Sequence, residues 1–370
     1  MKCRQFLMTV AMISILLVCS TCMASGNTEN CGLYWTAKIE AEEEDVRSYR
    51  CLCRYDESTG NVFITEVKGY IIDGGIPGKG FYMVDSDSHS AWVNEWGLPL
   101  GMGNKPFNLY YYSKEGEQLV YENIYYEDLI KVVAYWDGVL WYIDNYGKLA
   151  GVELASGTRQ ECTSSLIALK NEWINTVLPS GCMVGCINRL SELENENISK
   201  DLGPGRARDI ALPALALQDR DGKVTILAMD EGDKYETFES EYYDPISNCI
   251  YYSAKPYSKE ETGCDAITDI YRYSLADGSN TLCMIDMSDA LNRTQFHLDT
   301  WFVFPDGERI VFDVSSIPEY FSLSATKRDG FYIYDLYSQK TTKLYEMYET
   351  EHESQKIAWD DMLYFGYIGQ

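Results

Sequence analysis

The histidines of this chain show no spacing that is typical of catalysis. Only three are present, His89, His297 and His352, in unrelated sequence contexts. A Ser-His-Asp triad requires a base, an orienting acid and a nucleophile that meet in space. The Gly-x-Ser-x-Gly turn that presents the serine of α/β-hydrolases is absent from the sequence. We therefore expect surface histidines, no catalytic residues that can be named, and no histidine metal site.

Carboxylates are abundant, with 57 Asp and Glu in total. A pair of them could cleave a glycosidic bond, but the sequence does not single out two. The segment "SDSHSAW", Ser86–Trp92, resembles a sialidase box only superficially. Alternating acids in Asp219–Lys223 ("DRDGK") and Asp85–Ser88 ("DSDS") suggest calcium, yet Leu217 stands where an EF-hand-like loop needs its first acid. The prediction is a tight Asp-Gly turn, with no metal and no cofactor.

Nine of the twelve cysteines follow residue 24. Cys51 and Cys53 lie two residues apart in a predicted strand, about 6.6 Å from each other, which is near the upper limit for a disulfide. Cys182 and Cys186 would be roughly 13 Å apart if extended. Neither spacing matches a CxxC zinc knuckle. We expect buried free thiols that pack as small apolar residues, with one or two disulfides as the open alternative.

The N-terminus has the pattern of a secretory signal. Lys2 and Arg4 precede the apolar run "FLMTVAMISILLV", and small residues follow in "CSTCMASGN". The run is short for a membrane-spanning helix, which needs about 20 apolar residues. We predict cleavage after Ala24, so that 1–24 is the signal peptide and 25–32 a short linker. A lipid anchor at Cys19 or Cys22 is the alternative.

Composition describes a globular and strongly acidic protein. The hydrophobic share is 46%, and 31 Lys and Arg against 57 Asp and Glu give a net charge of −26. Such a field repels phosphate backbones, so nucleic acid is excluded as a partner, and a membrane is expected only through an N-terminal anchor or uncleaved signal. Thirty Tyr against 12 Phe suits half-buried strands, where the ring packs and the hydroxyl reaches water.

Internal repeats indicate the architecture. "LYWTAK" in Leu33–Val67 corresponds to "IYYSAK" in Ile250–Ile285, and an acidic loop follows in both copies. Arg309–Glu346 and Tyr135–Gln160 have the same plan of strand, turn and strand. Asp-Gly dipeptides between alternating strands predict hairpins, because Gly accepts the positive φ of a type I′ turn. A four-stranded sheet buries both faces only against neighbours, which favours a β-propeller.

The repeats predict blades at 80–122, 131–165, 172–230, 235–287 and 299–347, in one domain over 33–370. The unit at 33–67 lacks an opening strand, and the C-terminal "KIAWDDMLYFGYIGQ" could supply it and close the ring. Six blades of four antiparallel strands result, with five or seven as alternatives. Three segments fall between strands and are expected to be solvated loops, or else a rim or lid: Glu40–Arg47, Pro256–Asp265 and Asn188–Gly205.

The hairpin "FVFPDGERIVF" resembles the "SPDGxxIAF" blade element of TolB-like six-bladed propellers, with Phe304 where Ser is usual. The strands "IYRYSLADG" and "FYIYDLYSQ" support the resemblance, which covers most of 33–369 and extends to uncharacterised secreted propellers of clostridial type. It implies architecture and no chemistry: propellers of this type serve as scaffolds, binding partners or gates beside hydrolase domains.

Taken together, the sequence predicts an extracellular or cell-surface propeller, secreted or surface-tethered. It would be non-catalytic and bind an unidentified protein or glycan through one face or its central funnel. The alternative is a carbohydrate-active hydrolase or lyase with carboxylates in that funnel, about 5 to 9 Å apart for glycoside cleavage. A purely structural envelope component would show neither a funnel cluster nor a large apolar patch.

Overall fold

The computed structural model of the chain describes residues 30–40, 49–67, 69–85, 106–145, 148–161, 176–187, 213–230, 234–256, 269–283, 296–316, 330–346, 351–352, 355–358 and 365–369. These residues form β-strands and turns, and no α-helix occurs among them. Within these ranges no helix is long and apolar enough to cross a membrane. The chain is therefore all-β, as predicted.

The strands pair in meanders, in which each strand runs antiparallel to the next. The N-terminal sheet contains β1 (Gly32–Glu40), β2 (Tyr49–Asp56), β3 (Asn61–Val67), β24 (Glu351–His352), β25 (Gln355–Ala358) and β26 (Phe365–Ile368). An eight-stranded sheet contains β4 (Tyr70–Ile76), β5 (Gly80–Val84), β6 (Phe107–Ser113), β7 (Gly116–Ile124), β8 (Leu129–Trp136), β9 (Val139–Asp144), β10 (Leu149–Glu153) and β11 (Thr158–Glu161).

Three four-stranded sheets contain the remaining strands. The first contains β12 (Thr176–Val177), β13 (Met183–Ile187), β14 (Ala214–Gln218) and β15 (Val224–Met229). The second contains β16 (Tyr235–Asp244), β17 (Cys249–Pro256), β18 (Asp269–Ser274) and β19 (Asn280–Cys283). The third contains β20 (Phe296–Val303), β21 (Arg309–Ser316), β22 (Gly330–Asp335) and β23 (Lys340–Glu346).

The eight-stranded sheet consists of two meanders, β4–β7 and β8–β11. They are joined only where β4 and β8 run parallel, through the pair Asp73 and Ala134. Because β4 begins at Tyr70, the first of these meanders starts before the predicted boundary at residue 80, and that prediction was wrong. The sequence "YIIDGGI" was missed because its glycines interrupt the alternation that marks a strand.

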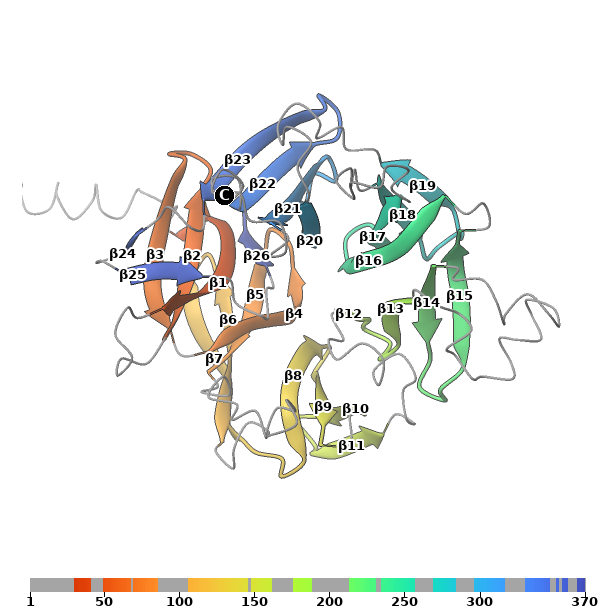
Figure 1. The fold of residues 1–370 in the computed structure, drawn as a ribbon. Helices are drawn as coiled ribbons and strands as arrows, with labels where there is room; N and C mark the ends of the chain where they lie inside the picture. Colours follow the sequence, from red (N-terminus) through yellow and green to blue (C-terminus); the bar gives the residue numbers. More distant parts are fainter. Residues whose placement is uncertain are drawn as a thin grey trace, which may run out of the picture.

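The sheets stand around a common centre, with β4, β8, β12, β16, β20 and β26 innermost (Figure 1). This radial arrangement is that of a β-propeller. Apolar clusters fill the space between neighbouring sheets. One joins β4–β7 to β8–β11 through residues such as Leu109 and Tyr142, and another joins β16–β19 to β20–β23 through Tyr251 and Phe312. The core is thus divided among the sheet interfaces, as a sheet with two apolar faces requires.

The predicted hairpin turns are present at the sequence signals. Asp137 and Gly138 connect β8 to β9 with φ angles of 49° and 87°, the positive values that a type I′ turn needs. In "FPDGER" the N–H of Gly307 donates to the carbonyl of Phe304 at 2.8 Å, and β20 and β21 pair on either side. Turn chemistry is local, which explains why it was visible in the sequence.

The C-terminal segment lies against the first strand. β26 pairs with Gly32–Trp35 and β25 pairs with Lys38–Glu40, both on the edge of β1 opposite β2. Gly366 of β26 approaches Phe81 so closely that an added Cβ would lie 2.3 Å from the ring. Phe365 packs against Phe331 with ring centroids 5.2 Å apart. β26 is therefore in contact with sheets on both of its sides.

Seven of the cysteines belong to the described part of the chain, and all seven are free thiols. Cys51 and Cys53 are both buried, with their sulfur atoms 3.8 Å apart, and Cys51 donates to the carbonyl of Ala37. They pack in one apolar cluster with Trp35 and Phe331. In this structure they serve as small apolar residues.

Candidate functional site

A partly open pocket lies at the centre of the ring, where the inner strands end. The open space there, counted together with the solvent in its mouth, is about 370 Å³. Every inner strand except β12 contributes to it. The lining residues are Ile72, Asp73, Gly74, Gly75, Pro77, Gly80, Phe81, Trp136, Tyr242, Tyr243, Pro245, Phe302, Phe365, Gly366 and Tyr367.

Irregular pairing places these side chains at the pocket. The register shifts between Ile72 and Ile76 in β4, between Glu239 and Tyr242 in β16, and just before Trp301 in β20. β8 also shifts, before Ala134. A β-bulge bends a strand and changes the direction of its side chains, and bulges are frequent beside functional sites. Here they occur in four of the inner strands.

Asp73 is the acidic residue among the described residues that line the pocket. Its carboxyl is surrounded by protein and keeps partial access to solvent through the pocket. Burial raises the pKa of Asp73 to about 8, and the positive charge of Lys131 opposes this shift only in part. None of the described residues donates a hydrogen bond to this carboxyl. Asp73 is therefore a half-buried acid without the hydrogen-bond partners that carboxylates inside proteins usually have.

Glycines let the backbone of β4 come this close to β8. Gly74 has a φ of +119°, and a Cβ at this position would lie 1.8 Å from the carbonyl oxygen of Tyr135. A Cβ on Gly75 would lie 2.6 Å from the carbonyl oxygen of Gly80. Only glycine fits these positions, so the sequence "DGG" fixes the place of the carboxyl.

Aromatic rings from four inner strands form the walls. Tyr242 of β16 contacts Phe302 of β20 with ring centroids 6.0 Å apart, and Phe302 contacts Tyr367 of β26 at 6.2 Å. Trp136 of β8 contacts Tyr243 of β16 at 6.1 Å in an edge-on arrangement. Most of these contacts are tilted or edge-on, the geometries that aromatic pairs prefer. The walls are therefore rigid and largely apolar.

Hydrogen bonds fix two of the wall residues. The indole Nε1 of Trp136 donates to the carbonyl of Val177 at 2.7 Å, which ties β8 to β12. The Tyr242 hydroxyl accepts from the N–H of Val303, and burial holds its pKa well above the usual value. The phenol of Tyr242 is consequently uncharged at physiological pH.

Glu241, the neighbour of Tyr242, is a second buried carboxyl, but it is not part of the pocket lining. Burial raises its pKa to about 7, while hydrogen bonds from the backbone and the thiol of Cys186 act in the opposite direction. Its own carbonyl accepts from the hydroxyl of Thr176 at 2.9 Å. Glu241 is therefore engaged with β12 and β13.

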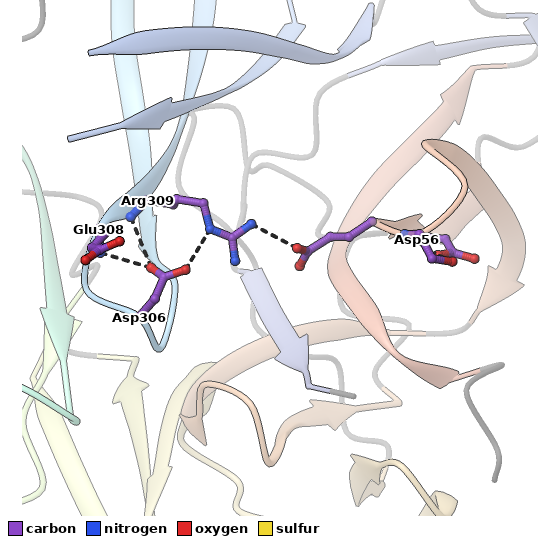
Figure 2. A network of polar contacts seen from close by, with 6 residues as sticks. Asp56, Asp306, Glu308 and Arg309 are labelled. Atoms are coloured by element: carbon purple, nitrogen blue, oxygen red, sulfur yellow. Dashed lines mark hydrogen bonds and ion pairs between the residues drawn. The ribbon is translucent and has the colours of Figure 1, made fainter. Parts of the chain in front are cut away.

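An ion-pair network lies beside the pocket, between two sheets (Figure 2). Arg309 of β21 contacts Asp306 at 2.7 Å within its own hairpin and Glu57 at 2.9 Å in the turn between β2 and β3. Its guanidinium also covers the ring of Phe304, 4.0 Å from the centroid. The Tyr367 hydroxyl bonds to Glu57 and to Arg309, and burial raises its pKa to about 12. We call Arg309, Glu57, Asp306 and Tyr367 the arginine network.

The predicted Asp-Gly turn is present at Asp219, whose carboxylate accepts from the N–H groups of Asp221 at 3.0 Å and Lys223 at 2.8 Å. Asp85 instead accepts from the side chain of Asn108 at 2.8 Å. Across the described ranges, no group of three or more His, Cys, Asp or Glu side chains could hold a metal ion.

Several predicted features lie outside the described residues or are described only in part. Outside the described residues lie Cys19, Cys22, His89 and the segments 41–47, 86–92, 188–205 and 257–265. For His297 in β20 and His352 in β24, only the backbone is described. Whether the histidines meet in a site is therefore not tested, and their predicted surface positions stay a prediction.

Asp73 is not among the site residues predicted from the sequence. Its signal was present in "YIIDGGIPGKGF", where an acid and two glycines interrupt an otherwise apolar strand. An isolated break of this kind marks a bulge or a close backbone approach. A single acid among 57 could not be assigned to the axis without knowing which strands are innermost.

No family model matches the sequence, and the search of curated proteins gave no significant match. Solved structures with a similar fold include a TolB-type protein from Agrobacterium tumefaciens, with 13% identity, 92% of this chain and 99% of that chain covered, and a TM-score of 0.42. An oligogalacturonate lyase from Vibrio parahaemolyticus has 12% identity, with 87% of this chain and 88% of that chain covered and a TM-score of 0.35. The β-propeller domain of the Trilobed protease from Pyrococcus furiosus has 11% identity, with 84% of this chain and 79% of that chain covered and a TM-score of 0.35.

Proposed function

We propose that this chain is an exported six-bladed β-propeller that binds a protein or glycan at its axial pocket and catalyses no reaction. The lining of the pocket carries this proposal. Among the described lining residues, rings from four inner strands share the pocket with one carboxyl, which is the chemistry of a recognition site, where stacking and a few polar groups select a ligand.

Three observations support six blades and a closed ring. The meanders β4–β7, β8–β11, β12–β15, β16–β19 and β20–β23 have four strands each, and β26 gives β1–β3 an inner fourth strand. An apolar cluster containing Trp35 and Phe331 joins the sheet of β1–β3 to that of β20–β23. Another cluster, with Leu52 and Met83, joins the sheet of β1–β3 to that of β4–β7. Pairing with β26 covers the edge of β1 that would otherwise be free.

Export and location are proposals from the sequence. We propose that 1–24 is removed as a signal peptide and that 33–370 forms the propeller, outside the cell or at its surface. The TolB-like blade element and the relation to clostridial-type secreted propellers remain part of this proposal. Mass spectrometry of the mature N-terminus tests it: a diacylglyceryl mass on Cys19 or Cys22 would replace cleavage after Ala24 by lipid anchoring.

One observation favours the alternative, a carbohydrate-active enzyme. An acid with a pKa of about 8 remains protonated at neutral pH, as a general acid must. Glycoside hydrolysis also needs a second carboxyl across the bond, about 5 to 9 Å away, and the described lining offers only Asp73. The pocket therefore favours binding.

The experiment uses the mature chain on a glycan and peptide array, followed by affinity measurements on the best ligand. We expect Tyr243→Ala, in the pocket wall, to lose at least about tenfold in affinity, the effect of one stacking contact. Tyr337→Ala is the matched control, because Tyr337 is 89% exposed and belongs to a turn. Equal effects of the two variants would contradict binding at the axis. Turnover of an oligosaccharide that Asp73→Asn abolishes would establish the enzyme instead.

A further inference from the structure

We propose that the axial pocket binds an organic ammonium group, held by the Asp73 carboxylate and enclosed by aromatic faces. This inference rests on the proposed binding role of the pocket and names the chemical class that it recognises. It follows from the combination of one unpartnered carboxyl with several rings at a single point of the fold.

None of the described residues places an opposite charge in contact with the carboxyl of Asp73. Lys131 of β8 acts on it through space without restoring an ordinary pKa, and the pKa stays at about 8. Among the described residues, Tyr242 of β16 lies near enough for the charge of Asp73 to raise the pKa of its phenol, and the phenols of Tyr243 and Tyr367 belong to the same lining. An incoming cation would supply the charge that the site lacks.

The walls fit the other requirement of such a cation. The faces of Trp and Tyr rings attract ammonium groups, and an array of rings around a carboxylate is how quaternary and primary ammonium ions are held. Trp136, Tyr242, Phe302 and Tyr367 supply rings from four strands. Phe302 contacts both Tyr242 and Tyr367, and Trp136 contacts Tyr243, so the rings are held in place without a ligand. A preformed cage binds more tightly because little ordering remains to be done.

Charge argues against the other ligand classes. The chain has a net charge of −26, so an anion is repelled on approach while a cation is attracted. A purely apolar ligand would leave Asp73 unpaired in a drier site, which is costly. The pocket is small, about 370 Å³ even with the solvent in its mouth, which favours a compact head group over an extended ligand.

Calorimetric titration of the mature chain with tetramethylammonium chloride tests the proposal, with tert-butyl alcohol as a neutral probe of similar shape and NaCl as the salt control. We expect binding of the cation only. Since the cation needs the charged carboxylate, its apparent Kd should rise about tenfold for each pH unit below about 8, and one proton should be released on binding near pH 7.

Variants separate the site from a general charge effect. Asp73→Asn should weaken binding at pH 9 at least about tenfold and abolish the pH dependence. Asp277→Asn removes an exposed turn carboxyl outside the pocket and should bind as the unmodified chain does. Circular dichroism confirms that both variants fold. Equal binding of tert-butyl alcohol, pH-independent binding, or an unaffected Asp73→Asn variant would overturn the ammonium assignment.

Two sources of the ammonium group are distinguished by a second probe, the peptide acetyl-Gly-Lys-Gly-amide. Tighter binding of the peptide would indicate a lysine side chain of a protein partner, and tighter binding of tetramethylammonium a free quaternary amine. Either outcome supports the assignment. If neither probe binds while an array ligand depends on Tyr243, the ammonium assignment fails and the binding role of the pocket stands.

Discussion

The axial pocket and the arginine network lie near each other but differ in whether their carboxylates are paired with a positive charge. Asp306 and Glu57 each contact the Arg309 guanidinium within 3 Å, at 2.7 Å and 2.9 Å, whereas Asp73 receives no ion pair and its pKa rises to about 8. Paired charges at a sheet interface position the sheets. A buried acid that the fold leaves unpaired costs stability, and such costs are typical of functional sites.

The largest expected effect is on stability, and it distinguishes the two regions when one glycine is replaced in each. Gly74→Ala places a Cβ 1.8 Å from the Tyr135 carbonyl beside the pocket, while Gly307 in the network hairpin, with a φ of +68°, has nothing within 4 Å. We expect Gly74→Ala to lose about 3 kcal/mol or more of unfolding free energy, and Gly307→Ala about 1 kcal/mol. Urea unfolding followed by tryptophan fluorescence measures both. Similar losses would show that β4 and β8 can separate without cost.

The pH dependence of stability tests the unpaired acids. Asp73 and Glu241 have pKa values of about 8 and about 7 in the folded chain, above the unfolded values of about 3.9 and 4.3. The folded state therefore binds more protons between these values, and the unfolding free energy falls as pH rises from about 4 to about 8. The slope is at most about 1.4 kcal/mol per pH unit for each group.

Unfolding curves at each pH measure this slope. Asp73→Asn should flatten it in its upper part, because the amide does not titrate. Asp277→Asn should leave it unchanged, since the pKa of Asp277 lies near 2, below this range. A stability that instead increases between pH 5 and 7 would mean that Asp73 is charged and paired in solution.

A smaller loss is expected in the network. Arg309→Met keeps an unbranched apolar side chain over Phe304 but removes the contacts with Glu57 and Asp306. These side chains are 28% to 36% exposed, so we expect a loss of about 1 to 2 kcal/mol that diminishes in high salt. A double-mutant cycle with Glu57→Gln isolates the link between the two sheets. A coupling energy of zero would show that the contact between Arg309 and Glu57 does not contribute to stability.

The smallest effect is expected at the hydroxyl of Tyr367, which belongs to both regions. Tyr367→Phe keeps the ring in the pocket wall and removes the hydrogen bonds to Glu57 and Arg309. We expect a loss of about 0.5 to 1 kcal/mol, the usual value for one such bond. Tyr337→Phe, at an exposed turn, should cost nothing measurable in the same unfolding assay. Loss of ligand binding in Tyr367→Phe would show that the hydroxyl also serves the pocket.

Much of the fold could be predicted because its signals are local. The turns at Asp137 and Phe304, the alternating strands between them, and the register of one hairpin are set by neighbours in sequence. The start of β4 was not predicted, since Gly74 and Gly75 break the alternation. The described cysteines are free thiols, and the "CLC" spacing does not specify how close the two sulfur atoms come.

The sequence by itself determined that this chain would bury apolar and tyrosine-rich strands in repeated antiparallel sheets, because strand alternation and turn residues act over a few positions. Only the tertiary structure decided which acid among 57 faces the axis. Asp73, Trp136, Tyr242 and Tyr367 come from four strands far apart in the chain, and bulges and close glycine contacts bring them together. Such convergence depends on distances between sheets, which no short stretch of sequence encodes.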